Sequence, residues 1–223
     1  MTTIVADDFE GVDICDKINA AVANRVLNGG SNITLRGGKY YSIANSFNLS
    51  AMPICLDLNG SILYFKAGVA GGLCTGVPAK FSTIKNGILA GSDKVPSPNN
   101  GLTLQSPFIN IENLTVGGFG QDSIAILSGE ASQPVSQNAD MWTAISILAL
   151  KSQRDNWHVA GGDSNKGTAI SLEMQSFGRY GLYEDSWVGG NRYINPIFDG
   201  KVPGSSNTAA QINSPNTYIS EVY

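Results

Sequence analysis

The chain has 223 residues, of which 14% are charged, and its formal net charge is −4. This balance argues against a general nucleic-acid surface, because binding to phosphate backbones depends on an excess of basic residues. We expect no membrane insertion, since the sequence has no apolar run of about 18 residues, and its first residues do not resemble a signal peptide. The 26 glycines and 9 prolines suit an all-β chain that is rich in turns.

Residues 1–30 predict an N-terminal strand and one amphipathic helix, which we expect to cap the rest of the chain. The helix spans Asp13 to Leu27, with Asp13 as its N-cap and Asn28 with the following glycines as its stop signal. One helical face carries the apolar residues Ile14, Ile18, Ala21, Val22 and Val26. Such a helix covers the apolar end and the open strand edge that a stack of strands otherwise exposes.

The remaining residues, 31–223, predict short strands separated by turns. The first of them are the β-branched runs "NITLRGGKYYSI", "ICLDLNGSILYF" and "STIKNGILAG". The three cysteines, Cys15, Cys55 and Cys74, are widely spaced and form no C-x-x-C pair. We therefore expect free thiols rather than disulfides, and no metal site or cofactor.

A repeated pattern then predicts how these strands are arranged. The spacing Leu114-x-Val116-x-x-Phe119 recurs from Leu172, and more loosely from Ile147. Self-similarity at steps of 20 to 50 residues indicates a solenoid. We predict an all-β, right-handed parallel β-helix, with a β-sandwich as the alternative because it also has short strands and frequent turns.

The segments "DDFEGVDICDKINAAV", "IENLTVGGFGQDSIAI" and "GLYEDSWVGGNRY" together resemble the pectate-lyase-like β-helix superfamily, above all bacteriophage tailspike and capsule-depolymerase domains. Of that superfamily's "DG-x-x-DD-T" phrase, only Gly11 and Asp13 are present. The resemblance implies a homotrimer in a phage virion or outside the cell, which binds or cleaves bacterial surface polysaccharide. From its length, we expect the chain to be either one part of a longer spike or a fragment that depends on assembly. A fold by itself does not assign an activity.

Cleavage of a glycosidic bond usually requires two carboxyl groups, which stacked coils can bring together. The candidates for acid and base are Asp155, Asp163, Glu173, Glu184, Asp185 and Asp199. In the repeat alignment Asp122 and Asp155 share a column, and Arg154 and Arg179 share the column beside it. These columns predict either a patch that faces a saccharide or a ladder of charge pairs along a turn.

Glu184 has two interpretations. The repeat register places it beside Val159 on the inward side, where burial raises the pKa of a carboxyl and favours a general acid. A bend at Gly181 would instead shift the register by one residue, so that Glu184 faces water and Asp185 faces inward. We expect the shifted register.

Substrate binding is predicted for aromatic and basic side chains in the last third of the chain, because flat rings stack on sugars. The candidates are Arg154, Arg179, Tyr183, Trp187, Arg192 and the single histidine, His158. Trp157 aligns with inward positions and is expected in the core. The stretch "GGDSNKG" offers an Asp-x-Asn turn that suits either calcium or ordinary turn chemistry, and we expect the turn.

The sequence therefore predicts recognition of bacterial surface polysaccharide, with cleavage of its glycosidic bonds by hydrolysis or by lyase chemistry. A lyase needs a base and a cation beside a uronate carboxylate, for which the arginines are the candidates. The alternative is a non-catalytic spike module that binds glycan or mediates trimer assembly.

Overall fold

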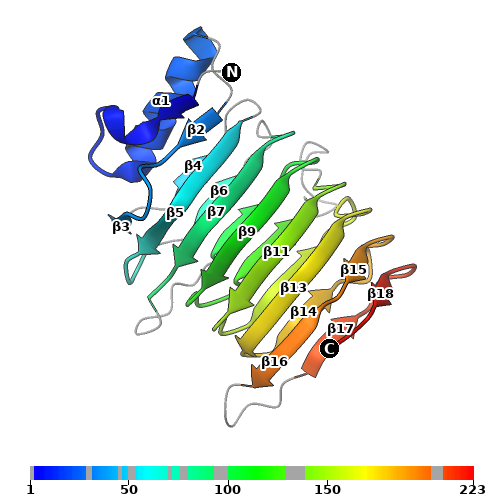
Figure 1. Cartoon of the computed structure of the whole chain (residues 1–223). Coiled ribbons are helices and arrows are strands. Elements are labelled where there is room, and N and C mark those ends of the chain that lie inside the picture. The colour runs from blue at the N-terminus through cyan, green and yellow to red at the C-terminus, as the bar shows by residue number, and fades with distance from the viewer. Residues whose placement is uncertain are drawn as a thin grey trace.

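The computed structural model describes residues 3–28, 32–44, 47–49, 54–69, 72–75, 80–92, 100–128, 139–201 and 208–223. It is a solenoid of about seven turns, in which parallel strands stack along one axis (Figure 1). Every strand pairing among the described residues is parallel, so the β-sandwich alternative is wrong. The parallel β-helix with an N-terminal capping helix is confirmed.

Two sheets form the walls of the solenoid within the described residues. The larger sheet consists of β1 (Thr3–Val5), β2 (Asn32–Thr34), β3 (Tyr40–Ile43), β5 (Cys55–Phe65), β7 (Thr83–Ala90), β9 (Asn110–Gly117), β11 (Thr143–Leu150), β13 (Thr168–Phe177), β15 (Arg192–Ile194), β16 (Ile197–Lys201) and β18 (Tyr218–Ser220). The smaller sheet consists of β4 (Phe47–Leu49), β6 (Leu73–Thr75), β8 (Leu102–Leu104), β10 (Ile124–Leu127), β12 (Asp155–Ala160), β14 (Tyr180–Glu184) and β17 (Thr208–Ile212).

The predicted repeat is the stacking unit. Ile147 pairs with Leu114 on one side and with Leu172 on the other, and all three side chains are buried. In the smaller sheet Trp157 lies between Ile124 and Leu182. Trp157 is fully buried, which confirms its predicted place in the core. The interior is therefore a set of apolar columns, each filled by residues from successive coils.

The long strands of the larger sheet bend along one line, which divides that sheet into two faces. Asn86, Asn113, Ser146 and Ser171 lie on this line, and each has a positive φ between 50° and 59°. Asparagine tolerates this left-handed conformation better than most residues do. The Asn113 side chain also donates a hydrogen bond to that of Asn86 (3.2 Å), which links neighbouring coils at the bend.

Helix α1 (Ile14–Asn28) follows the short helix η1 (Ala6–Asp8) and lies at the N-terminal end of the stack (Figure 1). Asp13 is its N-cap as predicted, since its carboxylate accepts hydrogen bonds from the backbone N–H groups of Cys15 (2.8 Å) and Asp16 (3.2 Å). The predicted apolar face is buried against the first coils at Ile14, Ile18, Ala21 and Val22, whereas the Val26 side chain lies outside the described residues. Cys15 and Cys55 are free thiols, and the Cys74 side chain also lies outside that description. None of the described helices has the length and hydropathy that a membrane crossing requires.

At the corner between β13 and β14 the coils approach so closely that only glycine fits. A Cβ at Gly178 would lie 1.9 Å from the backbone oxygen of Gln153, one coil away. Backbone atoms cannot move aside as the end of a side chain can, so the corner that carries Arg179 depends on this glycine.

We expect Gly178→Ala to lower the free energy of unfolding by about 1 to 3 kcal/mol or more, because overpacking forces the two coils apart. Gly162→Ala is the matched control, since a Cβ at Gly162 meets no atom within 4 Å. Urea unfolding followed by circular dichroism measures both variants. Equal midpoints for the two would contradict the close approach.

Candidate functional site

The corner between the two sheets carries a ladder of ion pairs, which we call the corner ladder: Asp122, Arg154, Asp155 and Arg179. Arg154 binds both carboxylate oxygens of Asp122, with Nε 2.7 Å from Oδ1. One coil further along, Arg179 binds both oxygens of Asp155, with Nε 3.0 Å from Oδ1. The two predicted columns therefore exist, and the charge-pair interpretation of them is confirmed.

The carboxylates of the corner ladder also accept hydrogen bonds from the backbone of the next coil. Asp122 Oδ1 accepts from the Asp155 N–H (3.2 Å), and Asp155 Oδ1 accepts from the Tyr180 N–H (3.2 Å). In the preceding coil the side-chain oxygen of Asn100 accepts from the Asp122 N–H in the same way (3.2 Å). Each acidic or amide side chain thus joins its own coil to the following one.

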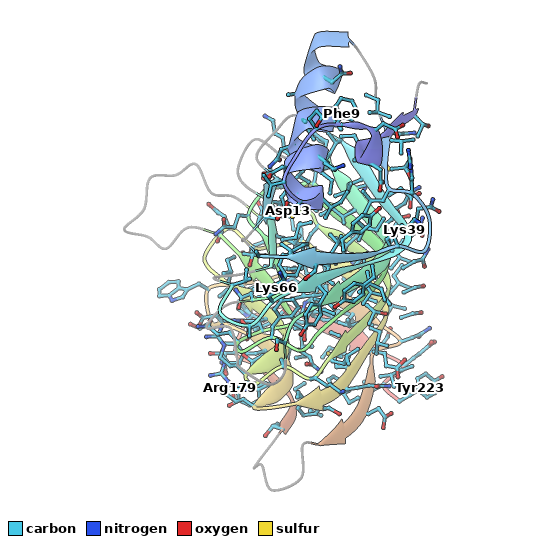
Figure 2. The ribbon with its side chains drawn as sticks, turned by 90° about the vertical axis from the view of Figure 1, so that its left-hand side faces the viewer. Phe9, Asp13, Lys39, Lys66, Arg179 and Tyr223 are labelled. Carbon is cyan, nitrogen blue, oxygen red and sulfur yellow. The ribbon has the colours of Figure 1, made fainter. Side chains whose placement is uncertain are left out.

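The negative and positive charges of the corner ladder differ in their exposure to solvent. Both aspartate side chains are fully buried, whereas the side chains of Arg154 and Arg179 are 36% and 45% exposed. The surface at this corner therefore presents guanidinium donors with their counter-charges beneath them. Figure 2 shows Arg179 on the opposite side of the stack from Tyr223.

The pairing shifts the ionisation of these groups. Burial by itself raises the pKa of Asp122, but hydrogen bonds from Arg154 and His158 outweigh it, so the pKa is lower than the ordinary value. The hydrogen bond to Asp122 raises the pKa of Arg154, and the hydrogen bond to Asp155 raises that of Arg179. The pairing therefore favours the charged forms of Asp122, Arg154 and Arg179.

An aromatic platform adjoins the exposed guanidinium of Arg179. The rings of Tyr180 and Tyr183 are stacked, with centroids 5.3 Å apart and planes 16° apart, and Arg179 Cζ lies 4.8 Å from each centroid. The His158 ring meets the Tyr183 ring edge-on at 5.1 Å. We call the four residues Arg179, Tyr180, Tyr183 and His158 the cation–aromatic surface. Cation–π contacts hold the guanidinium against the rings without covering its remaining donors.

The expected shift of register at Glu184 is wrong. Glu184 faces the interior and is fully buried beside Val159. Gly181 does not bend the strand. A Cβ there would lie 2.7 Å from the Ala209 backbone oxygen, so this glycine makes room for the next coil. Asp185 is therefore not turned inward, and it accepts a hydrogen bond from the Ser186 N–H (2.6 Å).

The Glu184 carboxylate is occupied by four donors from later in the chain. Oε1 accepts from Asn191 Nδ2 (2.8 Å) and the Tyr193 hydroxyl (2.7 Å). Oε2 accepts from the hydroxyls of Ser214 and Thr217, the latter at 2.6 Å. Burial, together with neighbouring Glu184, raises the pKa of Tyr193 well above its ordinary value. Glu184 therefore anchors the last coils, and no lone pair of its two oxygens is directed to solvent.

Two other candidate carboxylates are brought together on the outer face of the larger sheet. The Gln175 side-chain nitrogen donates to Glu173 Oε1 and lies 3.5 Å from Asp199 Oδ2. The two oxygens that share this nitrogen lie at most about 6 Å apart, so the carboxyl groups are close enough for the roughly 5 to 9.5 Å separation of glycosidase pairs. Glu173 is half-buried and Asp199 is exposed, so both can meet a substrate.

The remaining candidates do not join either group. Asp163 is exposed in a turn where Asn165 binds backbone groups of Gly162 and Gly189, each at 2.8 Å, which is the expected turn chemistry. Trp187 is 76% exposed in the turn after β14, and Arg192 is exposed on the larger sheet, at the start of β15. Asp122 was missing from the candidates, although its shared column with Asp155 was the signal that could have identified it.

Asp122, Asp155 and His158 place possible metal ligands within 4.8 Å of one another. The Asp122 carboxylate accepts four hydrogen bonds and the Asp155 carboxylate accepts three, so an incoming cation would have to displace these donors. We interpret this group as part of the ion-pair network.

Comparison with known proteins identifies the fold and no family. No family model matches the chain, and no curated protein matches it. Full-length tailspike protein 2 from an Escherichia coli O157:H7 bacteriophage is similar in structure, with a TM-score of 0.75 at 13% identity over 100% of this chain and 31% of that one. ORF18 of Geobacillus virus E2 gives a TM-score of 0.76 at 12% identity over 99% of this chain and 48% of that one.

The chain has the fold of phage tailspike proteins. The enzymatically active domain of bacteriophage CBA120 tailspike protein 2 is also similar, with a TM-score of 0.74 at 13% identity over 100% of this chain and 35% of that one. The chain thus spans about a third to a half of the length of these structures. At such identities the similarity establishes the fold alone.

The corner ladder makes a prediction about acid stability. Because the pKa of Asp122 is lowered on folding, its ion pair stabilises the protein above the ordinary carboxyl pKa of 3.8, and this contribution is lost as the pH falls further. Asp122→Asn should therefore flatten the loss of stability below about pH 4. Urea midpoints over a pH series measure this, with Asp185→Asn as the control. Identical slopes for Asp122→Asn and the wild type would contradict it.

Proposed function

We propose that this chain recognises bacterial surface polysaccharide through the cation–aromatic surface. The observation that carries the proposal is the contact of exposed Arg179 with the stacked rings of Tyr180 and Tyr183, beside the corner ladder that joins consecutive coils. Aromatic rings bind the apolar faces of sugars, and the guanidinium offers donors to hydroxyl or acidic groups. A rigid strand surface loses little entropy when it binds a ligand.

The tailspike fold also supports a proposal about the kind of protein that carries this surface. In this proposal the chain is a module of a phage tailspike or a related extracellular protein and forms a homotrimer. An apolar column on the outer face of the larger sheet supports association, because Ile145, Ile170 and Ile194 lie side by side there and are at least partly exposed. Exposed apolar columns of this kind are typical of subunit interfaces.

Cleavage of the bound glycan by hydrolysis is a second candidate function, and the pair Glu173 and Asp199 favours it. This is the one pair from the candidate pool that the described residues bring together with both carboxyl groups open to solvent. Asp155 is paired with Arg179, and Glu184 accepts hydrogen bonds from buried donors. If Glu173 and Asp199 are inactive, these commitments support the alternative of a non-catalytic binding module.

Binding is tested with an array of capsular and lipopolysaccharide glycans, followed by titration of the glycans that bind. We expect Arg179→Gln and Tyr183→Ala each to weaken binding about 10-fold, because each loses one favourable contact of about 1 kcal/mol or more. Trp187→Ala is the control, since Trp187 is exposed but lies outside the cation–aromatic surface. Unchanged affinity in both variants, or no binding by the wild type, would contradict the proposal.

Hydrolysis by the carboxyl pair requires an acid and a base, so Glu173→Gln and Asp199→Asn should each lower the release of reducing ends by at least about 100-fold. Glu112→Gln is the matched control, because Glu112 also lies half-buried on the larger sheet, at the register position of Lys85 and Ile145. Wild-type rates in both pair variants would remove these residues from any mechanism.

A further inference from the structure

His158 is held by a buried carboxylate. Its Nδ1 lies 2.8 Å from Asp122 Oδ2 and 3.2 Å from a guanidinium nitrogen of Arg154. A carboxylate only accepts hydrogen bonds, so we assign a proton to Nδ1 from the shorter contact, because the opposite tautomer would set two lone pairs against each other. The Arg154 nitrogen is itself a donor, so its 3.2 Å approach to Nδ1 is then a contact and not a hydrogen bond. Asp122 therefore fixes the tautomer and the orientation of the imidazole.

The same tautomer leaves a lone pair on Nε2. Among the described residues, no side chain makes a hydrogen bond with this atom, and the imidazole is 12% exposed. A histidine that donates Nδ1–H to a buried aspartate and presents an unpaired Nε2 has the arrangement of a general base.

The groups around His158 indicate what this base would act on. The charged or titratable groups nearest to it are Asp122, Asp155, Arg154 and the phenol of Tyr183. Both aspartates are fully buried, whereas the arginines are more than a third exposed. A ligand at the cation–aromatic surface therefore meets guanidinium donors and rings, which suit an acidic sugar.

We propose that His158 is the catalytic base of a polysaccharide elimination reaction on uronate-containing glycans, with Asp122 as its positioning residue. This inference rests on the proposed function, because it requires the glycan to bind at the cation–aromatic surface. Arg179 binds the uronate carboxylate and offsets the charge that develops when the adjacent carbon loses its proton.

The step balances without an oxidant or a metal. His158 Nε2 removes the proton on the carbon next to the uronate carboxyl group. The electrons of that C–H bond form a double bond to the neighbouring ring carbon, and the C–O bond from this neighbour to the next sugar breaks. The departing oxygen takes a proton from solvent, and His158 later releases its own proton to solvent. The products are a new chain end and an unsaturated uronate.

One experiment tests the tautomer directly. Because the chain has a single histidine, the nitrogen NMR spectrum of histidine-labelled protein contains one imidazole. The expected spectrum of the neutral imidazole shows a protonated Nδ1 and an unprotonated Nε2, and Asp122→Asn should change the balance between the tautomers. A protonated Nε2 with a bare Nδ1 would overturn the inference.

A second experiment tests the chemistry, with alginate, polygalacturonate and hyaluronan added to the capsular glycans. The expected product is an unsaturated uronate with its ultraviolet absorbance. His158→Ala should lower this rate at least about 100-fold and should be partly rescued by added imidazole, which a purely structural role would not produce. Asp122→Asn should lower kcat with little change in KM, whereas Asp155→Asn, which frees Arg179, should mainly raise KM.

The outcomes separate this inference from the proposed function. Binding of a uronate glycan without an unsaturated product overturns the inference and leaves recognition intact, as does binding of neutral glycans alone. Reducing ends without unsaturation, lost in Glu173→Gln, favour hydrolysis by the carboxyl pair instead. If no glycan binds, both proposals fail.

Discussion

The register of the parallel coils is the constraint on which the rest of this structure depends. Neighbouring strands lie about 4.8 Å apart, so residues 24 to 33 positions apart in sequence become direct neighbours. Apolar columns fill the interior because Leu114, Ile147 and Leu172 share one position. The same repetition places Arg154 against Asp122 and Arg179 against Asp155. Packing and surface chemistry thus have one geometric origin.

The corner ladder shows how a stack of coils can hold buried carboxylates. Removing a charge from water costs several kcal/mol, which a bidentate arginine and a backbone donor together offset. Asp122 and Asp155 use this arrangement to join consecutive coils. One consequence is that the negative charges are buried while the guanidinium groups are partly exposed. Another is the firm orientation of His158.

The carboxyl groups that the sequence predicted as acid and base have different roles in the structure. Glu184 closes the last coils through four donors and behaves as part of the core. Glu173 and Asp199 remain open to solvent on a different sheet from His158. The tailspike fold accommodates either of these surfaces as a site, because the fold supplies the columns while the side chains determine the chemistry.

The sequence by itself determined the coil, the inward columns and the neighbouring aspartate and arginine columns, because these follow from a repeated spacing. It also determined the capping helix, through its N-cap and its apolar face. It did not determine the register at Glu184, where Gly181 indicated a bend but in fact makes room for the next coil. It also did not show that Asp122 holds His158, or that Gln175 joins Glu173 to Asp199. Those contacts depend on side-chain rotamers across coils, and only the tertiary structure decides them.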